Sequence, residues 1–98
     1  MARRIVWSIR ASTELKDIFE YWSNRNKSNT YNIKLNHRIQ SFLHILKVFP
    51  ELGKKTDVTG VRVHPIDNYL IFYEMADLDT ILIISFWDGR QNPDRIKF

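Results

Sequence analysis

Residues 61–87 read VRVHPIDNYLIFYEMADLDTILIISFW, and they contain three short runs rich in β-branched and aromatic residues. These runs are residues 61–64, 69–75 and 80–87, and turn-forming polar residues separate them. Runs of this length and composition predict strands. Because the connections are short, the three strands should form an antiparallel meander.

Upstream of the meander, the sequence predicts one more strand and two helices. Residues 3–8 alternate like a strand, and Ser8 is a suitable N-cap for a helix over residues 9–25. The apolar residues of this first helix recur at spacings of three and four, at Ala11, Leu15, Ile18 and Trp22, with Phe19 widening the face. A second helix has its apolar positions at Leu35, Ile39, Phe42, Leu43, Leu46 and Phe49. Pro50 should end it.

The order β-α-α-β-β-β predicts an α+β fold, in which a helical hairpin packs on a mostly antiparallel four-stranded sheet. Residues 50–60 have neither helical nor strand periodicity and are expected to form a loop. At 98 residues the chain should be a single domain, spanning 1–98. The strands at 69–75 and 80–87 are apolar on both faces, so part of the second face is expected to be a functional or partner-binding surface.

The composition excludes several classes of protein. A hydrophobic fraction of 44% with 27% charged residues is ordinary for a globular chain and argues against disorder. No apolar run approaches the roughly 20 residues of a membrane span. The sequence contains no cysteine, which excludes disulfides and thiolate chemistry. With no secretory segment behind Met1, we expect a cytoplasmic protein that needs neither cofactor nor metal.

Positive charge is concentrated in the first half of the chain. Residues 1–50 hold nine Lys/Arg and three Asp/Glu, whereas residues 51–98 hold six and eight. This excess indicates a polyanionic or acidic partner, although a solubilising surface would give the same count.

The residues best suited to chemistry are cationic. Lys54 and Lys55 precede the strand that carries Arg62, and Arg90 follows the last strand. If strand ends converge at one edge, these side chains would bind phosphates or an acidic target surface. Solvated surface charges are the alternative reading.

Other residue types add less to this cluster. His64 can act as an acid or base, or it can simply be a polar residue at a strand end. Trp87, with Tyr69 and Tyr73, offers base-stacking surfaces unless these rings belong to the core. His37 and His44 are expected on the surface of the second helix.

Motifs in four parts of the chain are similar to those of RelE/ParE superfamily toxins. They are Trp7-Ser8-x-x-Ala11-x-x-x-Leu15-x-x-Ile18-x-x-Tyr21-Trp22, Phe49-Pro50-Glu51-Leu52-Gly53, Val61-Arg62 followed by Tyr69-Leu70-Ile71-Phe72-Tyr73, and Ile81 to Trp87 followed by Asp88-Gly89-Arg90-Gln91-Asn92-Pro93. The resemblance runs from Val6 to Pro93 and implies the toxin of a bacterial type II toxin–antitoxin, or plasmid stabilisation, system. It also implies a small, acidic, partly disordered antitoxin as the neutralising partner.

The superfamily has two kinds of target, and the resemblance leaves open whether this chain is an enzyme. ParE-like members inhibit DNA gyrase, whereas RelE-like members cleave ribosome-bound mRNA. Arg62 and Arg90 match two arginine positions, and Lys54 and Lys55 lie near the lysine positions. A RelE-like reaction would use Arg62, Arg90 and His64. Target contact would involve Lys54, Lys55, Arg62, Arg90, Trp87 and Arg95.

The end of the chain favours the ParE-like alternative. No Tyr or His follows Arg90, so a nuclease would have only His64 as a conventional base. The chain is therefore expected to inhibit growth through gyrase, with mRNA cleavage as the alternative. A third possibility is a non-toxic relic that only binds an antitoxin. We expect the antitoxin to cover the helical hairpin and the sheet edge, burying Phe19 or Leu78.

Overall fold

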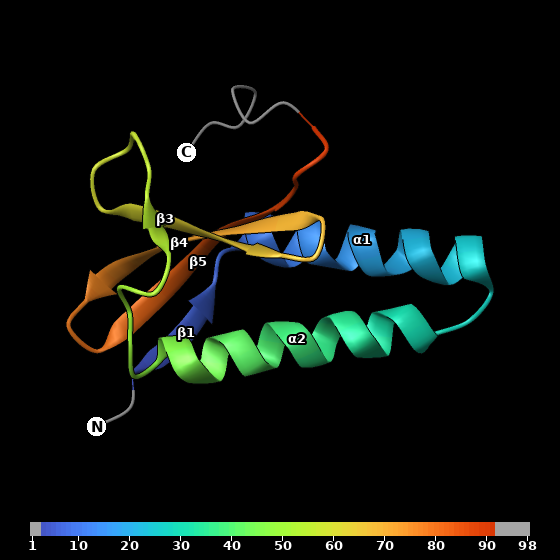
Figure 1. Ribbon diagram of the computed structural model, residues 1–98, viewed down its shortest axis with the longest axis horizontal. Coiled ribbons are helices and arrows are strands. Elements are labelled where there is room, and N and C mark those ends of the chain that lie inside the picture. Colours follow the sequence, from blue (N-terminus) through green and yellow to red (C-terminus); the bar gives the residue numbers. More distant parts are fainter. Residues whose placement is uncertain (1–2, 92–98) are drawn as a thin grey trace.

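The computed structural model describes residues 3–91 and contains two helices and one five-stranded sheet (Figure 1). The elements are β1 (Arg4–Trp7), α1 (Ile9–Asn26), α2 (Thr30–Leu46), β2 (Lys54–Lys55), β3 (Val61–Ile66), β4 (Tyr69–Asp77) and β5 (Thr80–Asp88). The strand order is β1-β5-β4-β3-β2, and only the β1–β5 pair is parallel. This architecture confirms the predicted α+β class.

The core lies between the helical hairpin and one face of the sheet. Alternate residues of β4, namely Tyr69, Ile71 and Tyr73, point into it and are at most 2% exposed. The hairpin contributes most through α2, whose buried residues are Leu35, Ile39, Phe42, Leu43 and Leu46. Within residues 3–91, neither helix is long and apolar enough to cross a membrane.

The first helix begins where the sequence predicts. Ser8 is its N-cap, and the Ser8 hydroxyl accepts a hydrogen bond from the Ala11 N–H at 3.0 Å. The second helix ends earlier than its apolar spacing suggests. Its last residue is Leu46, and Phe49 is 63% exposed, so the prediction that Phe49 belongs to the buried stripe is wrong. Pro50 explains the early end, because in a continued helix its ring would clash with the carbonyl four residues earlier, that of Leu46.

The strand count differs from the predicted four. Lys54–Lys55 forms a short edge strand, β2, which pairs with Val63 and Arg62 of β3. Two lysines give no apolar alternation, so the sequence pattern could not indicate a strand there. The third strand also continues through Pro65 to Ile66. Because β2 pairs only as far as Val63, Pro65 lies at the open edge, where proline is tolerated in strands.

Candidate functional site

Two of the predicted target-binding cations, Lys55 and Arg62, lie opposite each other at the β2–β3 edge of the sheet, and Lys54 is the neighbour of Lys55 on β2. Lys55 pairs directly with Arg62 across the two strands, and Lys54 pairs with Val63. Lys55 and Arg62 also line a hollow of about 290 Å³, together with the 56–61 segment. The pair Lys55 and Arg62 places two like charges directly opposite each other, an arrangement that destabilises a sheet. We call Lys54, Lys55 and Arg62 the cationic edge.

The loop before the cationic edge is held by two side chains from the sheet. The Arg62 guanidinium donates to the Gly53 carbonyl at 2.8 Å and to the Glu51 carbonyl at 3.3 Å. The Tyr73 hydroxyl accepts from the Gly53 N–H and donates to the Pro50 carbonyl, both at 2.8 Å. Burial raises the pKa of Tyr73, which keeps the hydroxyl protonated as a donor. Arg62 therefore positions the loop in addition to lending charge.

Gly53 is required at this point by the close approach of the sheet. A Cβ atom there would lie 2.8 Å from the Tyr73 hydroxyl oxygen and 3.0 Å from the Val63 carbonyl oxygen. The roles of Gly53 and Tyr73 escaped the sequence reading, which placed Tyr73 among possible stacking surfaces or core residues. The motif Phe49-Pro50-Glu51-Leu52-Gly53 was the available signal, because it ends on this glycine.

Arg90 does not join the cationic edge. Arg62 pairs with Tyr73 on β4, whereas Arg90 follows Asp88, which pairs with Tyr69. Four residues of β4 separate the two positions, a distance of about 14 Å along the strand. The expectation that these strand ends converge on one shared rim is therefore wrong for Arg90. The missing information was the strand register.

The Arg90 guanidinium already forms an ion pair with the Asp88 carboxylate. Its Nε and Nη2 atoms donate to the two Asp88 oxygens at 3.0 and 2.8 Å. Hydrogen bonding from Arg90 holds the pKa of Asp88 below its usual value, so the pair stays ionised at neutral pH. Binding a phosphate through Arg90 would first require breaking this two-bond pair.

The aromatic residues do not form one stacking surface. Tyr69 and Tyr73 are 2% and 1% exposed and belong to the core, so they cannot stack on bases. Trp87 pairs with Leu70, and it follows Phe86, which faces the core, so its half-buried ring lies on the opposite side of the sheet. Arg95, the remaining predicted contact, lies outside the described residues.

His64 lies under α2, on the same face of β3 as Arg62. Its ring stacks on Phe42, with the two centroids 4.4 Å apart and the planes 15° from parallel. Burial lowers the pKa of His64, so the imidazole is neutral at neutral pH. A neutral imidazole can accept a proton, but this ring also serves as packing for α2.

The lowered pKa predicts how His64 affects stability. Because the folded protein disfavours the imidazolium, the unfolded chain binds the proton first as pH falls below about 6.5. The stability that His64 contributes is present above that pH and is lost as the pH falls through the folded pKa. Lowering the pH from 7.5 to 5.5 should therefore reduce the melting temperature of the wild-type protein more than that of His64→Gln. Parallel pH profiles for the two proteins would contradict this account.

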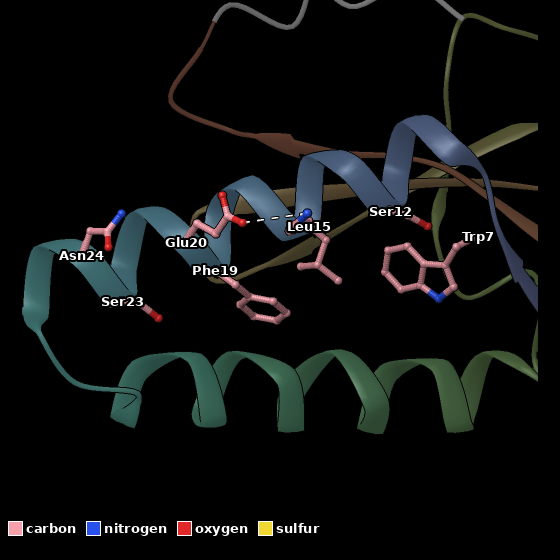
Figure 2. Close-up of a pocket in the computed structure, with 8 residues that line it drawn as sticks. Trp7, Ser12, Leu15, Phe19, Glu20, Ser23 and Asn24 are labelled. Carbon is pink, nitrogen blue, oxygen red and sulfur yellow. Dashed lines mark ion pairs between the residues drawn. The ribbon is translucent and has the colours of Figure 1, made fainter.

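A second feature is an apolar groove along α1. Its volume is about 690 Å³, and Trp7, Leu15 and Phe19 form its apolar part. Figure 2 shows these three side chains pointing from β1 and α1 toward α2. The polar part consists of Ser12, Lys16, Glu20, Ser23 and Asn24. Phe19, which we expected an antitoxin to bury, is thus half-buried inside this groove, whereas Leu78 is 86% exposed on the β4–β5 turn.

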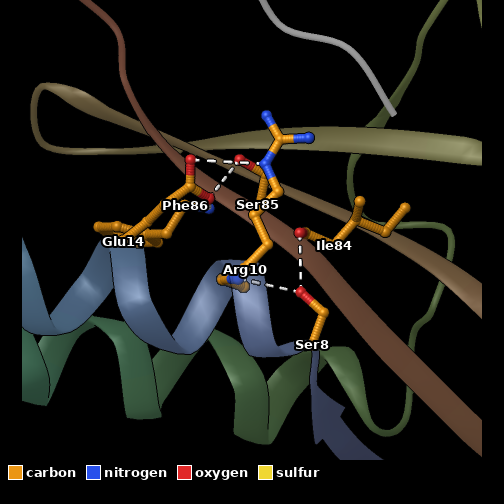
Figure 3. Close-up of polar contacts among 7 residues, drawn as sticks. Ser8, Arg10, Glu14, Ile84, Ser85 and Phe86 are labelled. Carbon is orange, nitrogen blue, oxygen red and sulfur yellow. Dashed lines mark hydrogen bonds and ion pairs between the residues drawn. The ribbon is translucent and has the colours of Figure 1, made fainter.

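Polar contacts fix α1, and with it the groove, to the sheet (Figure 3). Ile84 is an extra residue in β5, because Ser85 pairs with Phe72 while Ile83 pairs with Tyr73. The Glu14 carboxylate accepts from the Ser85 hydroxyl at 2.7 Å and from the Phe86 N–H at 3.2 Å. The Ser8 hydroxyl donates to the Ile84 carbonyl at 2.9 Å. The first turns of α1 therefore satisfy the polar groups that this bulge frees.

Clusters of metal-ligating side chains are absent from the part of the chain that the structure describes. Between Arg3 and Gln91, no group of three or more His, Asp or Glu side chains is placed to hold a metal.

Comparison with known proteins agrees with the family resemblance of the sequence. A family model described as the ParE toxin of the type II toxin–antitoxin system parDE matches residues 5–93. A solved structure titled "Chromosomal ParDE TA system from P. aeruginosa" is similar with a TM-score of 0.72. The two chains are 15% identical, and the match covers 89% of this chain and 96% of that one. No curated protein sequence matches. The chain belongs to the ParE toxin family of type II toxin–antitoxin systems.

Proposed function

We propose that the chain inhibits DNA gyrase by binding it, without catalysis, and that a cognate antitoxin neutralises it. The observation that supports gyrase binding without catalysis is the separation of the candidate catalytic groups. Arg90 lies about 14 Å along β4 from Arg62 and is paired with Asp88, and His64 is packed against Phe42. What remains is the cationic edge, whose Lys54 and Lys55 are exposed and suit contact with an acidic protein surface. Gyrase is cytoplasmic, so we place the activity there.

The neutralising half of the proposal is supported by apolar surface on the hairpin. The groove of Trp7, Leu15 and Phe19 has the size and lining of a site for apolar side chains. A small, acidic, partly disordered antitoxin that folds on binding could fill it, since coupled folding lets a short chain cover a large surface. Leu78, exposed on the β4–β5 turn, is a second contact for such a chain.

The alternative is a ribosome-dependent mRNA endonuclease, and one observation favours it. His64 and Arg62 lie two residues apart on the same face of β3, and the imidazole is neutral and able to accept a proton. Primed ribosomes incubated with the protein decide between the two mechanisms. We expect intact messages; cleavage that Arg90→Ala and His64→Gln both abolish would replace the gyrase mechanism by this one.

Controlled expression in growing bacteria tests the proposal in cells. We expect growth arrest and loss of supercoils from a reporter plasmid, both relieved by co-expressing an antitoxin encoded next to the gene for this chain. The double variant Lys54→Ala/Lys55→Ala should arrest growth much less, whereas the control Arg90→Ala should behave like wild type. Growth that wild-type protein leaves untouched would instead identify a relic that serves only to bind an antitoxin.

A further inference from the structure

The segment that joins α2 to β2 exposes apolar side chains. Phe49 is 63% exposed and Leu52 is 41% exposed, and Val48 next to Phe49 is 59% exposed. Neither the core nor the cationic edge uses these three side chains. Single exposed apolar residues are common on protein surfaces, but three of them within five residues are typical of a binding surface.

The backbone of this segment is held in place although its side chains are exposed. The Phe49 N–H donates to the Ile45 carbonyl at 2.9 Å, and the Phe49 carbonyl accepts from the Leu52 N–H at 3.1 Å, which closes a turn. The residues around this turn are bonded to Tyr73 and Arg62 of the sheet. Because the backbone is already fixed, Phe49 and Leu52 can contact a partner at a small entropic cost of ordering.

The same segment borders a hollow of about 330 Å³ at the end of the sheet. Pro50 and Glu51 line it from the segment, and Met75, which is 38% exposed, lines it from β4. Arg3 and Arg62 line it as well. The hollow is large enough to accept a side chain of a partner. We call Val48, Phe49, Leu52 and Met75 the exposed apolar patch.

The exposed apolar patch adjoins the cationic edge. In Figure 1 the segment runs from the end of α2 to the edge of the sheet that β2 and β3 form. Residues 47–55 hold three lysines and one acidic residue, Glu51. Lys54 and Lys55 are exposed, and no ion pair involving either occurs among the described side chains. The complementary surface would therefore be apolar and bordered by carboxylates.

We propose that the exposed apolar patch and the cationic edge form one surface that binds an acidic, partly apolar face of gyrase, with Phe49 as the main apolar contact. This inference rests on the proposed inhibition of gyrase. Side chains such as Leu52 and Met75 neither pair with phosphates nor stack on bases as aromatic rings do, so they favour a protein over a nucleic acid. Exposed aromatic residues often supply much of the binding energy of a protein interface.

Binding of the labelled full-length chain to purified gyrase, without DNA, tests the proposal. Phe49→Ser should weaken binding roughly 30-fold, and Leu52→Ser roughly 5-fold, through lost apolar burial. The matched control is Ile33→Ser, which truncates an aliphatic side chain that is 68% exposed near the start of α2. This control should bind like wild type, and an equal loss in it would show that the effect is not specific to the patch and that the proposal is wrong.

Charge variants test whether the partner surface is acidic. Glu51→Gln removes the one negative charge of the segment, so it should strengthen binding about 2-fold at low salt and less at high salt. Lys54→Ala/Lys55→Ala should weaken binding under the same conditions. If Glu51→Gln weakens binding instead, the partner surface is not acidic and the proposal is wrong.

A check of folding keeps the test decisive. Because Phe49 is exposed, Phe49→Ser should keep its melting temperature within about 4 °C of wild type. If it falls further, Leu52→Ser at an unchanged melting temperature decides, and wild-type affinity in that variant overturns the proposal.

The outcomes separate this inference from the proposed function. Wild-type affinity in Phe49→Ser and Leu52→Ser, combined with weak binding of Lys54→Ala/Lys55→Ala, overturns the exposed apolar patch and leaves gyrase inhibition through the cationic edge standing. No binding of the wild-type chain to gyrase overturns both. A 20-nucleotide single strand of DNA is the second probe. If it binds wild type, and Phe49→Ser weakens it as much as it weakens gyrase binding, the surface is a nucleic-acid site and the proposal is wrong.

Discussion

Replacing Tyr73 by Phe should lower the unfolding free energy by about 2 kcal/mol and loosen the loop that leads into the cationic edge. The change leaves the Gly53 N–H and the Pro50 carbonyl without their partner, and an unsatisfied buried group costs about 1–3 kcal/mol. For a chain of this size the melting temperature should fall on the order of 10 °C. Amide hydrogen exchange should speed up at Gly53.

The matched control is Tyr69→Phe. It makes the same chemical change on the same strand and core face, but it removes the bond from Trp22 Nε1 to the Tyr69 hydroxyl at 2.7 Å. This variant should also be less stable, while Gly53 keeps its wild-type exchange rate. If Tyr73→Phe leaves Gly53 as protected as before, then Arg62 alone holds the loop and the role given to Tyr73 is wrong.

Removing the Glu14 carboxylate should have an effect of similar size. Glu14→Ala deprives the Ser85 hydroxyl, on a residue that is 0% exposed, and the Phe86 N–H of their acceptor. We expect a loss of about 2–3 kcal/mol in denaturant unfolding. Glu14→Gln keeps one acceptor oxygen and should lose about half as much.

A double-mutant cycle separates this contact from a general loss of helix stability. Ser85→Ala removes the stronger donor, so Glu14→Ala should cost less in that background than in wild type. The expected coupling energy is about 1 kcal/mol. Strictly additive losses would show that the carboxylate does not support the bulge at Ile84, and that Ser8 alone ties α1 to β5 there.

The helices were predictable from their apolar periodicity, and the meander was predictable from its runs of β-branched and aromatic residues. Ala11 and Leu35 are buried on the faces that the spacing predicts, and β4 and β5 lie where the apolar runs lie. Periodicity reports which side of an element is buried. It does so for any element long enough to repeat, which is why the buried faces of both helices agree with the sequence reading.

The short edge strand and the meeting of distant side chains were not predictable in this way. β2 exists because Tyr73 and Arg62 hold residues 50–53 against the sheet, and such contacts leave no local pattern. The distance between Arg62 and Arg90 depends on the two-residue turn at Asp67 and on the bulge at Ile84. The order of the strands does not determine which residues pair across them. Two cations that both lie near strand ends in the sequence, such as Arg62 and Arg90, can therefore be far apart in the fold.

The most direct test of gyrase inhibition is a supercoiling assay with purified gyrase, relaxed plasmid and increasing amounts of the purified chain. We predict that supercoiling stops as the chain approaches the gyrase concentration, that Arg90→Ala inhibits equally well, and that Lys54→Ala/Lys55→Ala inhibits far more weakly. Undisturbed supercoiling at saturating wild-type protein would contradict the account.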